Sequence, residues 1–251
     1  QGEVVGLAGL LGSGRTELAQ VLFGSGMPDN GEIFWWGEKA GIHSPADAIK
    51  KGMGFCTEDR KTEGIIPHLS VRENITIALL PKLNSFGFVK TKEQDEIVRS
   101  YIDRLKIKTP TPEQAICNLS GGNQQKVILS RWLATHPDLI ILDEPTVGLD
   151  PRQIIDIREL IKSLGKGHTV ILSSHILSEV SAVCDHILIL SKGKLVASDT
   201  PEGLGRRMQR TNVYDMLVQG GPEPLGELLG GIHGLRAITT APHESGFAAV
   251  H

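Results

Sequence analysis

The stretch of sequence that decides the fold is Gly9-Leu-Leu-Gly-Ser-Gly-Arg-Thr16. It follows a short apolar run at Val4–Ala8, which is typical of a strand, and it precedes a helix-like segment at Thr16–Phe23. Glycines in such a turn let backbone N–H groups point inward around phosphate oxygens, and the start of the following helix adds partial positive charge. This order predicts a phosphate-binding loop, with a plain tight connection between strand and helix as the structural alternative.

The last two residues of this loop have separate predicted roles. The usual pattern has Lys before the final hydroxyl residue, and this chain has Arg15 there. Arginine keeps the charge and can bind phosphate with two hydrogen bonds, although its planar group places that charge differently from a compact ammonium. We therefore expect nucleotide binding and leave hydrolysis open, with Thr16 as a Mg²⁺ ligand. The predicted nucleotide contacts in the loop are Gly9, Gly12, Ser13, Gly14, Arg15 and Thr16.

A second glycine-containing helix start is Leu119-Ser-Gly-Gly-Asn-Gln-Gln125, which precedes a helix with apolar residues at helical spacing. Ser120 and the glycine pair Gly121 and Gly122 can bind an anion at the start of that helix. The same residues also fit a serine N-cap followed by flexible glycines. Both interpretations are open on these residues alone.

This second stretch resembles the signature motif of the ATP-binding cassette (ABC) ATPases. The resemblance implies that Ser120, Gly121 and Gly122 contact the γ-phosphate of an ATP that the phosphate loop of an opposing cassette holds. It also adds Gln124 to the nucleotide-binding residues. The cofactors it implies are ATP and Mg²⁺, and the partners are a second cassette, identical or different, and transmembrane permease subunits.

Two acids close the apolar run Leu139-Ile-Ile-Leu-Asp143-Glu144. An apolar strand delivers carboxylates at its C-terminal end to the sheet edge where ligands bind. A helix cap before Pro145 is the structural alternative. Within the resemblance, Asp143 looks like the aspartate that holds Mg²⁺ directly or through water, and Glu144 looks like the general base for the attacking water.

Three further positions gain a role from the resemblance. Gly148-Leu-Asp150 is similar to the D-loop, which crosses the dimer interface, and Asp150 also suits a helix N-cap. His175 follows a strand-like run and matches the family's switch histidine, which touches the γ-phosphate; an ordinary histidine satisfied by its neighbours is the alternative. Glu58 stands where the family has its Q-loop glutamine, and it can meet Mg²⁺ or water or belong to a solvated loop.

Strand-like and helix-like pieces alternate along the chain, which indicates an α/β fold with a mainly parallel sheet flanked by helices. With the motifs above, we expect a P-loop NTPase of the ABC type. A helical subdomain is predicted at about 70–135, where Ser70–Glu73 and Thr91–Gln94 both have capping-box spacing. We expect the cassette to occupy 1–205, and 206–251 to form a small α+β appendix or to be partly disordered.

Composition narrows the classes of protein that fit. The 251 residues have a net charge of -3, which counts against a broad electrostatic contact with nucleic acid, so no nucleic-acid partner is expected. No apolar run is long enough to span a bilayer. Cys56, Cys117 and Cys184 are widely spaced and indicate buried thiols in a reducing compartment, with no disulfide framework or zinc site. We expect a cytoplasmic protein that lies peripherally on the inner face of the cell membrane.

The resemblance divides the chain between two subfamilies. Residues 2–146 resemble the second cassette of bacterial monosaccharide importers, which typically has Arg in the phosphate loop. Residues 147–200 resemble single-cassette exporter ATPases, and a mosaic origin is a hypothesis that explains the mixture. The family normally begins with β-structure and an adenine-stacking aromatic residue ahead of the loop, but only eight residues precede Gly9 here. The expectation is therefore a cassette whose N-terminal strands are truncated.

The implied function is an ATP-binding and ATP-hydrolysing subunit that powers an ABC transporter through head-to-tail pairing of cassettes. A degenerate partner cassette that binds ATP without hydrolysing it is favoured by Arg15 and Glu58 and opposed by Glu144 and His175. A soluble ABC ATPase that acts on nucleic acid or ribosomes is opposed by the net charge of -3. A different phosphate-loop enzyme, such as a kinase or GTPase, is opposed by the signature stretch.

Overall fold

The computed structural model describes residues 2–85, 87–209, 216–219, 225, 228–229, 240–243 and 247–250. It divides the chain into two compact units, Gln1–Pro201 and Glu202–His251. The motifs identified above all lie in the first unit, so the fold of that unit positions the candidate site.

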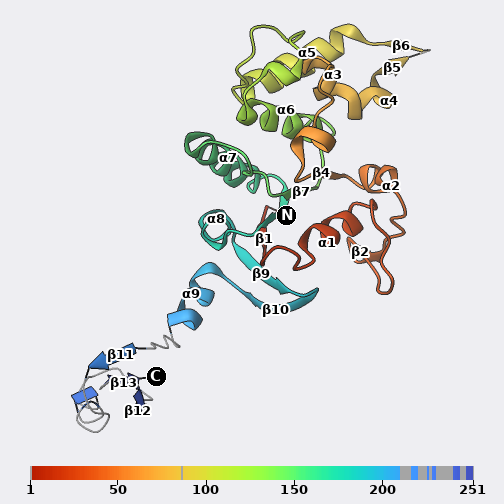
Figure 1. Ribbon diagram of the computed structural model, residues 1–251. Coiled ribbons are helices and arrows are strands. Elements are labelled where there is room, and N and C mark those ends of the chain that lie inside the picture. Colours follow the sequence, from red (N-terminus) through yellow and green to blue (C-terminus); the bar gives the residue numbers. More distant parts are fainter. Residues whose placement is uncertain are drawn as a thin grey trace. The chain divides into compact units, whose positions relative to one another are not determined.

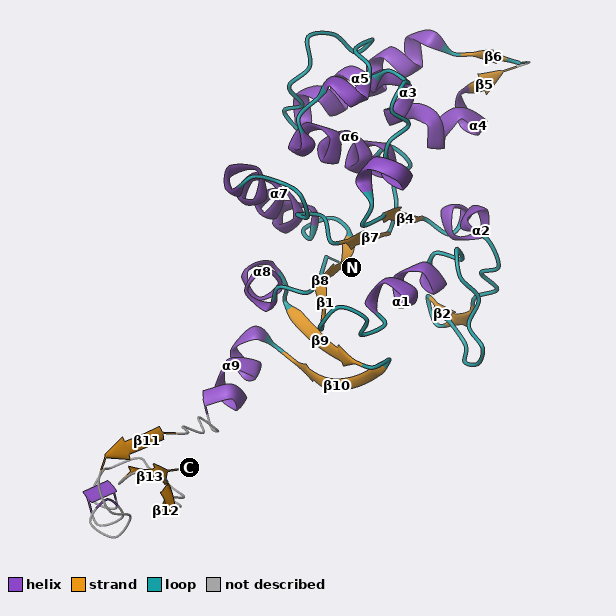
Figure 2. Ribbon diagram, viewed as in Figure 1, coloured by secondary structure: helices purple, strands orange, loops and turns teal. Residues whose placement is uncertain are grey.

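The first unit is built on a six-stranded sheet in which the strand order is β10-β9-β1-β8-β7-β4 (Figure 2). All neighbouring strands pair in parallel except β10, which runs antiparallel to β9. The mainly parallel α/β sheet predicted from the sequence is therefore confirmed. The strands of this sheet are β1 (Val4–Ala8), β4 (Met53–Cys56), β7 (Leu139–Asp143), β8 (Thr169–Ser174), β9 (His186–Ser191) and β10 (Lys194–Asp199).

Helices cover both faces of this sheet. Figure 1 shows α1 (Arg15–Leu22) and α2 (Pro45–Lys50) on one side of the strands, and α7 (Pro151–Leu164) and α8 (Leu177–Val183) on the other. Since a central strand covered on both faces has no solvent-facing side, β7 is buried along its whole length and is apolar up to Asp143. A Cβ atom at Gly6 in β1 would lie 2.1 Å from Cγ1 of Val180, so the close approach of α8 depends on this glycine.

One cluster of buried side chains fills the space between α1, α2 and the sheet. The short hairpin of β2 (Phe34–Trp35) and β3 (Glu38–Lys39) lies beside it, and Trp35 packs against it. This packing fixes α1, and with it the end of the phosphate loop, against β4 and β7. The buried members are Ala19, Phe23, Ala40, Ile42, Ala48, Met53, Phe55, Leu139 and Ile141.

A helical subdomain is inserted between β4 and β7, at the top of Figure 1. Its longest helices, α5 and α6, pack with α3 around buried apolar side chains, as the sequence pattern predicts. Its elements are η1 (Arg60–Gly64), α3 (Val71–Thr76), η2 (Ile77–Leu79), α4 (Leu80–Leu83), β5 (Asn84–Ser85), β6 (Phe88–Val89), α5 (Thr91–Arg104), η3 (Ile116–Asn118) and α6 (Gly121–Leu133). Cys117 in η3 is exposed, so the prediction of a buried thiol is wrong for this residue.

The two predicted capping boxes have different outcomes. The Ser70 side chain accepts a hydrogen bond from the backbone N–H of Glu73, and the Glu73 carboxylate accepts one from the backbone N–H of Ser70, so this box is formed. The box predicted at Thr91 is wrong, because Lys90 is the N-cap of α5 and no side chain caps that helix. Gln94 instead donates to Thr76 Oγ1 at 2.8 Å, a tertiary contact that local spacing does not reveal.

Substitution of Ser70 by alanine is expected to lower the free energy of unfolding by about 1 kcal/mol, the usual cost of losing an N-cap side chain. Chemical denaturation of both proteins measures this difference. The matched control is Ser181→Ala, at an exposed position within α8, for which we expect a change within about 0.5 kcal/mol. Equal stability of Ser70→Ala and the parent would show that the box contributes nothing measurable.

The second unit contains α9 from Glu202 onward and a three-stranded antiparallel sheet in the order β11-β13-β12. The strands are β11 (Met216–Gln219), β12 (Thr240–His243) and β13 (Phe247–Val250), and α9 spans Pro201–Gln209. Much of the expectation for 206–251 falls outside the described residues. Among the helices in the described ranges, none combines the length and the apolar content needed to cross a membrane.

Candidate functional site

Three neighbouring strands bring the predicted motifs to one edge of the sheet. The phosphate loop follows β1, His175 follows β8, and Asp143 and Glu144 lie at the end of β7. The parallel register pairs Ala8 with Ser174 and Asp143 with Ser173, so these ends are level. The carboxyl edge of a parallel sheet is where ligands bind in such folds, and segments far apart in the sequence meet there.

The phosphate loop is a tight turn that depends on its glycines. Gly12 and Gly14 have φ values of 74° and 95°, a left-handed backbone that favours residues without a Cβ atom. The buried Ser13 donates its N–H to the carbonyl of Leu10 at 3.1 Å and accepts from the N–H of Gly193 at 2.9 Å. The loop is therefore held in shape both by its own turn and by the connection between β9 and β10.

Arg15 points across the sheet edge and pairs with Glu144. Its Nη1 atom lies 2.7 Å from Glu144 Oε1, and the two side chains are only 5% and 3% exposed. Nη1 also donates to Ser173 Oγ at 3.3 Å, and Nε donates to Ser13 Oγ at 3.3 Å. The sequence predicts a phosphate contact for this arginine, and no local pattern indicates an ion pair with a residue 129 positions away.

The Glu144 carboxylate receives three further hydrogen bonds. The backbone N–H of His175 donates to Oε1 at 2.8 Å, the His175 Nδ1 atom lies 2.9 Å from the same oxygen, and Ser174 Oγ donates to Oε2 at 3.2 Å. Burial alone would raise the pKa of Glu144, but the hydrogen bonds from Arg15 and His175 outweigh it, and the pKa is lowered. Glu144 is therefore an ionised carboxylate joined to His175, the other predicted catalytic residue, and to Arg15, a predicted nucleotide contact.

Asp143 provides a buried carboxylate that lacks partners. Both of its oxygens are buried without a hydrogen bond of standard geometry. Burial raises the pKa of Asp143, although the hydroxyls of Ser173 and Thr16 lie close enough to this carboxyl to oppose part of the rise. An unpaired buried carboxylate next to a threonine hydroxyl suits a hard cation such as Mg²⁺, which takes oxygen ligands and uses few from the protein. Among the described residues no cluster of three or more His, Cys, Asp or Glu side chains forms a metal site by itself.

Glu58 lies on the wall of a cleft beside these groups. The cleft is also lined by Thr16, Gln20 and Asp143, and by Val147 and Gly148 from the loop after β7. Burial raises the pKa of Glu58, and the nearby charges of Asp143 and Glu144 add to the rise. The structure thus brings Glu58 to the cleft that contains the predicted Mg²⁺ ligands.

The signature residues lie at a separate pocket. Ser120, Gly122 and Asn123 line it with side chains of α7, and none of its lining residues belongs to the cleft of Thr16 and Asp143. Ser120 precedes α6 but its side chain does not cap the helix; its hydroxyl oxygen accepts from Asn123 Nδ2 at 2.9 Å. A serine hydroxyl that accepts in this way keeps its own hydrogen free to donate to an anion.

Gln124 and Asp150 make contacts within the chain. Gln124 donates to the backbone carbonyls of Ile116 and Leu119 and accepts from Arg60 Nε at 3.3 Å, so it holds the start of α6 in place. The Asp150 side chain accepts from the backbone N–H of Arg152 at 3.1 Å and of Gln153 at 2.9 Å, which makes it the N-cap of α7.

Arg60 also lies at the cleft, and the sequence analysis does not identify it. It is largely buried and donates to Gln124 at 3.3 Å and to the backbone carbonyl of Val147 at 3.4 Å. It thereby joins the loop of Glu58, the start of α6 and the segment that leads to Asp150. No local signal distinguishes it, since a charged loop residue usually indicates solvent exposure.

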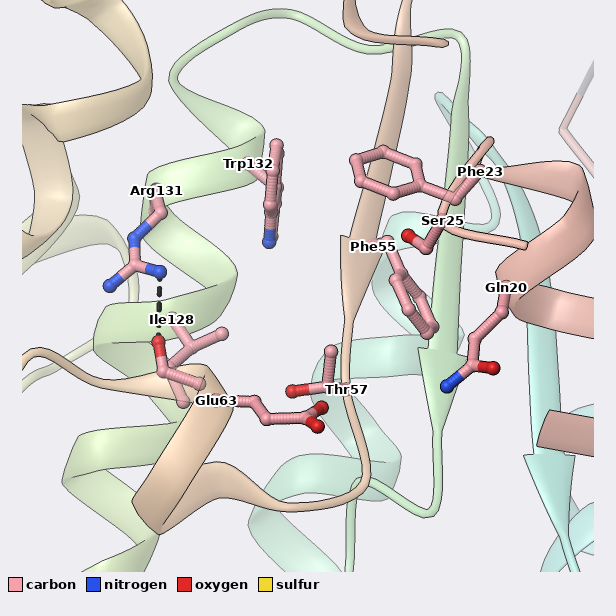
Figure 3. A pocket seen from close by; sticks show the side chains of 10 residues that line it. Gln20, Phe23, Ser25, Phe55, Thr57, Glu63, Ile128, Arg131 and Trp132 are labelled. Carbon is pink, nitrogen blue, oxygen red and sulfur yellow. Dashed lines mark hydrogen bonds between the residues drawn. The ribbon is translucent and has the colours of Figure 1, made fainter. Parts of the chain in front are cut away.

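A second cleft, whose lining side chains Figure 3 shows, adjoins the first. The Phe23 ring lies 5.3 Å from that of Phe55 and 5.5 Å, edge-on, from that of Trp132, centroid to centroid, and Arg131 Nη1 donates to a backbone carbonyl at 2.8 Å. The two clefts share four lining residues, so an occupant of one contacts side chains that line the other. The shared residues are Gln20, Phe55, Thr57 and Glu63.

Comparisons with known proteins show the family to which the chain belongs. The family model described as "ABC transporter" matches residues 1–147. A putative ribose/galactose/methyl galactoside import ATP-binding protein of Halalkalibacterium halodurans is 44% identical over 203 residues, which are 80% of this chain and 39% of the relative. The galactofuranose transporter ATP-binding protein of Escherichia coli is 48% identical over 197 residues, 78% of this chain and 39% of the relative.

The chain thus spans about two fifths of the length of these curated relatives. Among solved structures, the dimeric post-hydrolysis state of an ATP-binding cassette bound to ADP and phosphate has a TM-score of 0.68 at 24% identity, over 80% of this chain and 86% of that one. This likeness concerns the fold. Because 203 aligned residues exceed the 147 of the family match, the sequence similarity to import proteins continues beyond residue 147.

Proposed function

The chain belongs to the ABC transporter family, and on that premise we propose that it is an ATP-binding cassette that hydrolyses ATP to power a membrane transporter. The observation that carries this proposal is the joining of Arg15, Glu144 and His175 at the edge formed by β1, β7 and β8. A phosphate-binding cation, a carboxylate base and an imidazole at one strand edge suit phosphoryl transfer to water.

The phosphate loop is the part that binds the nucleotide. In the proposed site, its backbone N–H groups and the start of α1 surround the phosphates, with Gly9, Gly12, Ser13 and Gly14 providing the turn. Thr16 and Asp143 would hold Mg²⁺, because the unpaired buried carboxylate and the neighbouring hydroxyl fit that ion. Bound Mg²⁺ neutralises charge that builds on the phosphate oxygens.

Glu144 is the proposed general base. The lowered pKa keeps the Glu144 carboxylate ionised, so it can accept a proton from the attacking water. Its Oε1 atom, however, is already paired with Arg15 and His175, and an oxygen in that state is poorly placed to accept the proton. Phosphate groups in the loop compete for the same guanidinium. We infer that nucleotide binding draws Arg15 toward the phosphates and frees Glu144, while His175 stays near the transferred group.

Arg15→Lys tests this role of the guanidinium. A compact ammonium still neutralises phosphate but lacks the fork that reaches Glu144 Oε1, Ser13 and Ser173 at once. We expect a steady-state hydrolysis rate no lower than that of the parent and up to about tenfold higher, because one hydrogen bond to a charged group is worth about 1.5 kcal/mol. The matched control, Arg104→Lys on the exposed side of α5, should leave the rate unchanged. A collapse of activity in Arg15→Lys would mean that the loop requires arginine.

The separate position of the signature pocket supports a site completed by another chain. Ser120, Gly121 and Gly122 line no part of the cleft that contains Thr16 and Asp143. We propose that a second copy presents these residues to the nucleotide, with Asp150 near the interface. ATP binding then closes the pair, hydrolysis reopens it, and permease subunits convert this motion into transport.

The relatives support a proposal for the partners and the location. The name of one relative describes import of ribose, galactose or methyl galactoside, and the name of the other describes a galactofuranose transporter. We propose that this chain likewise serves a sugar transporter, from the inner face of the membrane. Co-purification with a membrane permease and ATP-dependent uptake of a labelled sugar test this. Co-purification with ribosomes in place of a permease would contradict it.

A non-hydrolysing partner cassette is the second candidate, and one observation favours it. The carboxylate of Glu144 is already engaged by Arg15 at 2.7 Å, which is a poor state for a base. The ATP hydrolysis rate of the purified chain distinguishes the two functions. Turnover that depends on Glu144 supports the first, whereas ATP binding without turnover supports the second.

A further inference from the structure

The start of α6 is covered by a side chain from α7. Gln153 Oε1 accepts a hydrogen bond from the backbone N–H of Gly122 at 2.8 Å. A Cβ atom at Gly122 would lie 2.9 Å from each of Cγ, Cδ and Oε1 of Gln153, so no larger residue fits while the carboxamide stays there. A neutral acceptor therefore occupies one of the N–H groups that a helix start offers to an anion.

The rest of this pocket offers further donors and positive charge to an anion. Ser120 keeps its hydroxyl hydrogen, since Asn123 donates to its oxygen. Two cationic side chains, Lys108 and Lys126, line the pocket with one acidic side chain, Asp156. Of the polar groups around the glycine pair, the N–H of Gly122 is the one already bonded to a side chain of α7.

We propose that Gln153 competes within its own chain for the place of the opposing nucleotide's phosphate. Its carboxamide must leave Gly122 before the phosphate binds there, so Gln153 sets how much ATP is needed to pair two cassettes. This inference rests on the proposed head-to-tail pairing. Gln153 is a positioning residue, because it acts through the N–H of Gly122 and touches no reacting atom.

Gln153 is hydrogen-bonded to the segment that leads into α7. Asp150 Oδ1 accepts from the backbone N–H of Gln153 at 2.9 Å, which fixes the first turn of α7, and from that turn the Gln153 side chain reaches the start of α6. A shift of Asp150 on pairing therefore moves the carboxamide. One short chain of hydrogen bonds thus joins the proposed interface loop to the proposed phosphate-binding residues of the same molecule.

The experiment measures ATP-driven dimerisation of the full chain by analytical ultracentrifugation, in a Glu144→Gln background that prevents turnover. Gln153→Met keeps the length of the side chain but cannot accept the N–H, so we expect the dimer dissociation constant to fall by about fivefold per site. The carboxylate in Gln153→Glu accepts the same N–H in a charge-assisted hydrogen bond and repels phosphate, so we expect the dimer dissociation constant to rise by more than about tenfold. The control Ile155→Met, exposed on the same helix, should not shift it.

We expect the dimer dissociation constant to shift in opposite directions in Gln153→Met and Gln153→Glu. A contact that only supports the structure would not produce opposite shifts. If both variants weaken pairing equally, with unfolding free energies measured alongside, Gln153 only supports the start of α6 and the inference is wrong. It is equally wrong if neither variant changes pairing. If the background protein with Gln153 intact does not dimerise with ATP, the proposed head-to-tail function itself fails, and the inference fails with it.

Discussion

Glu144→Gln is expected to lower the ATP hydrolysis rate by roughly a hundredfold or more, the usual contribution of a general base. The carboxamide keeps the size of the side chain but cannot take a proton from water. ATP affinity should be kept or increased, because Arg15 loses its anionic partner at 2.7 Å and becomes available to the phosphates. Phosphate release and equilibrium nucleotide binding measure the two effects separately.

The matched control for this prediction is Glu159→Gln, which removes an exposed carboxylate from α7. It should leave both hydrolysis and binding as in the parent. If Glu144→Gln turns over ATP at the rate of the control, Glu144 is not the base, and the joining of Arg15, Glu144 and His175 has another purpose.

Ser120→Glu is expected to reduce hydrolysis by a similar factor, roughly a hundredfold, for a different reason. A carboxylate in place of the hydroxyl repels the phosphate that the opposing cassette holds. Folding should be little affected, because Ser120 is exposed, its side chain caps no helix, and an acid is favourable at the start of α6. The chain should still bind ATP at its own phosphate loop, which equilibrium binding measures.

Ser181→Glu adds the same charge at an exposed position in α8 and is the control. Equal hydrolysis by Ser120→Glu and Ser181→Glu would show that Ser120 does not approach a phosphate. Loss of nucleotide binding in Ser120→Glu would show that the signature residues belong to the chain's own site, against the proposed pairing.

Local patterns in the sequence were sufficient for the parts of the fold that depend on near neighbours. The turn at Gly12 and Gly14 is predictable because a strand, glycines and a helix follow one another within a few residues. The apolar run before Asp143 is predictable because a strand covered on both faces has no polar side. The strand order, which places β1 between β8 and β9, was not predicted from the sequence.

The contacts that determine the geometry and charge of the site are long-range, and the sequence does not predict them. Arg15 and Glu144 are 129 positions apart, and Gly122 and Gln153 are 31 apart. Each of these residue types has many possible partners, and only the packed sheet and helices select one. The capping box expected at Thr91 failed for the same reason, because Gln94 finds a buried tertiary partner in Thr76.

The central claim is that each nucleotide site combines the phosphate loop and Glu144 of one chain with Ser120 of a second copy. Mixing Ser120→Glu with Glu144→Gln tests it, because every mixed pair has one site with both defects and one site with neither. The account predicts that the two inactive proteins together recover hydrolysis, to roughly a quarter of the parent rate for random pairing. A mixture as inactive as its components would contradict a site shared between two copies of this chain.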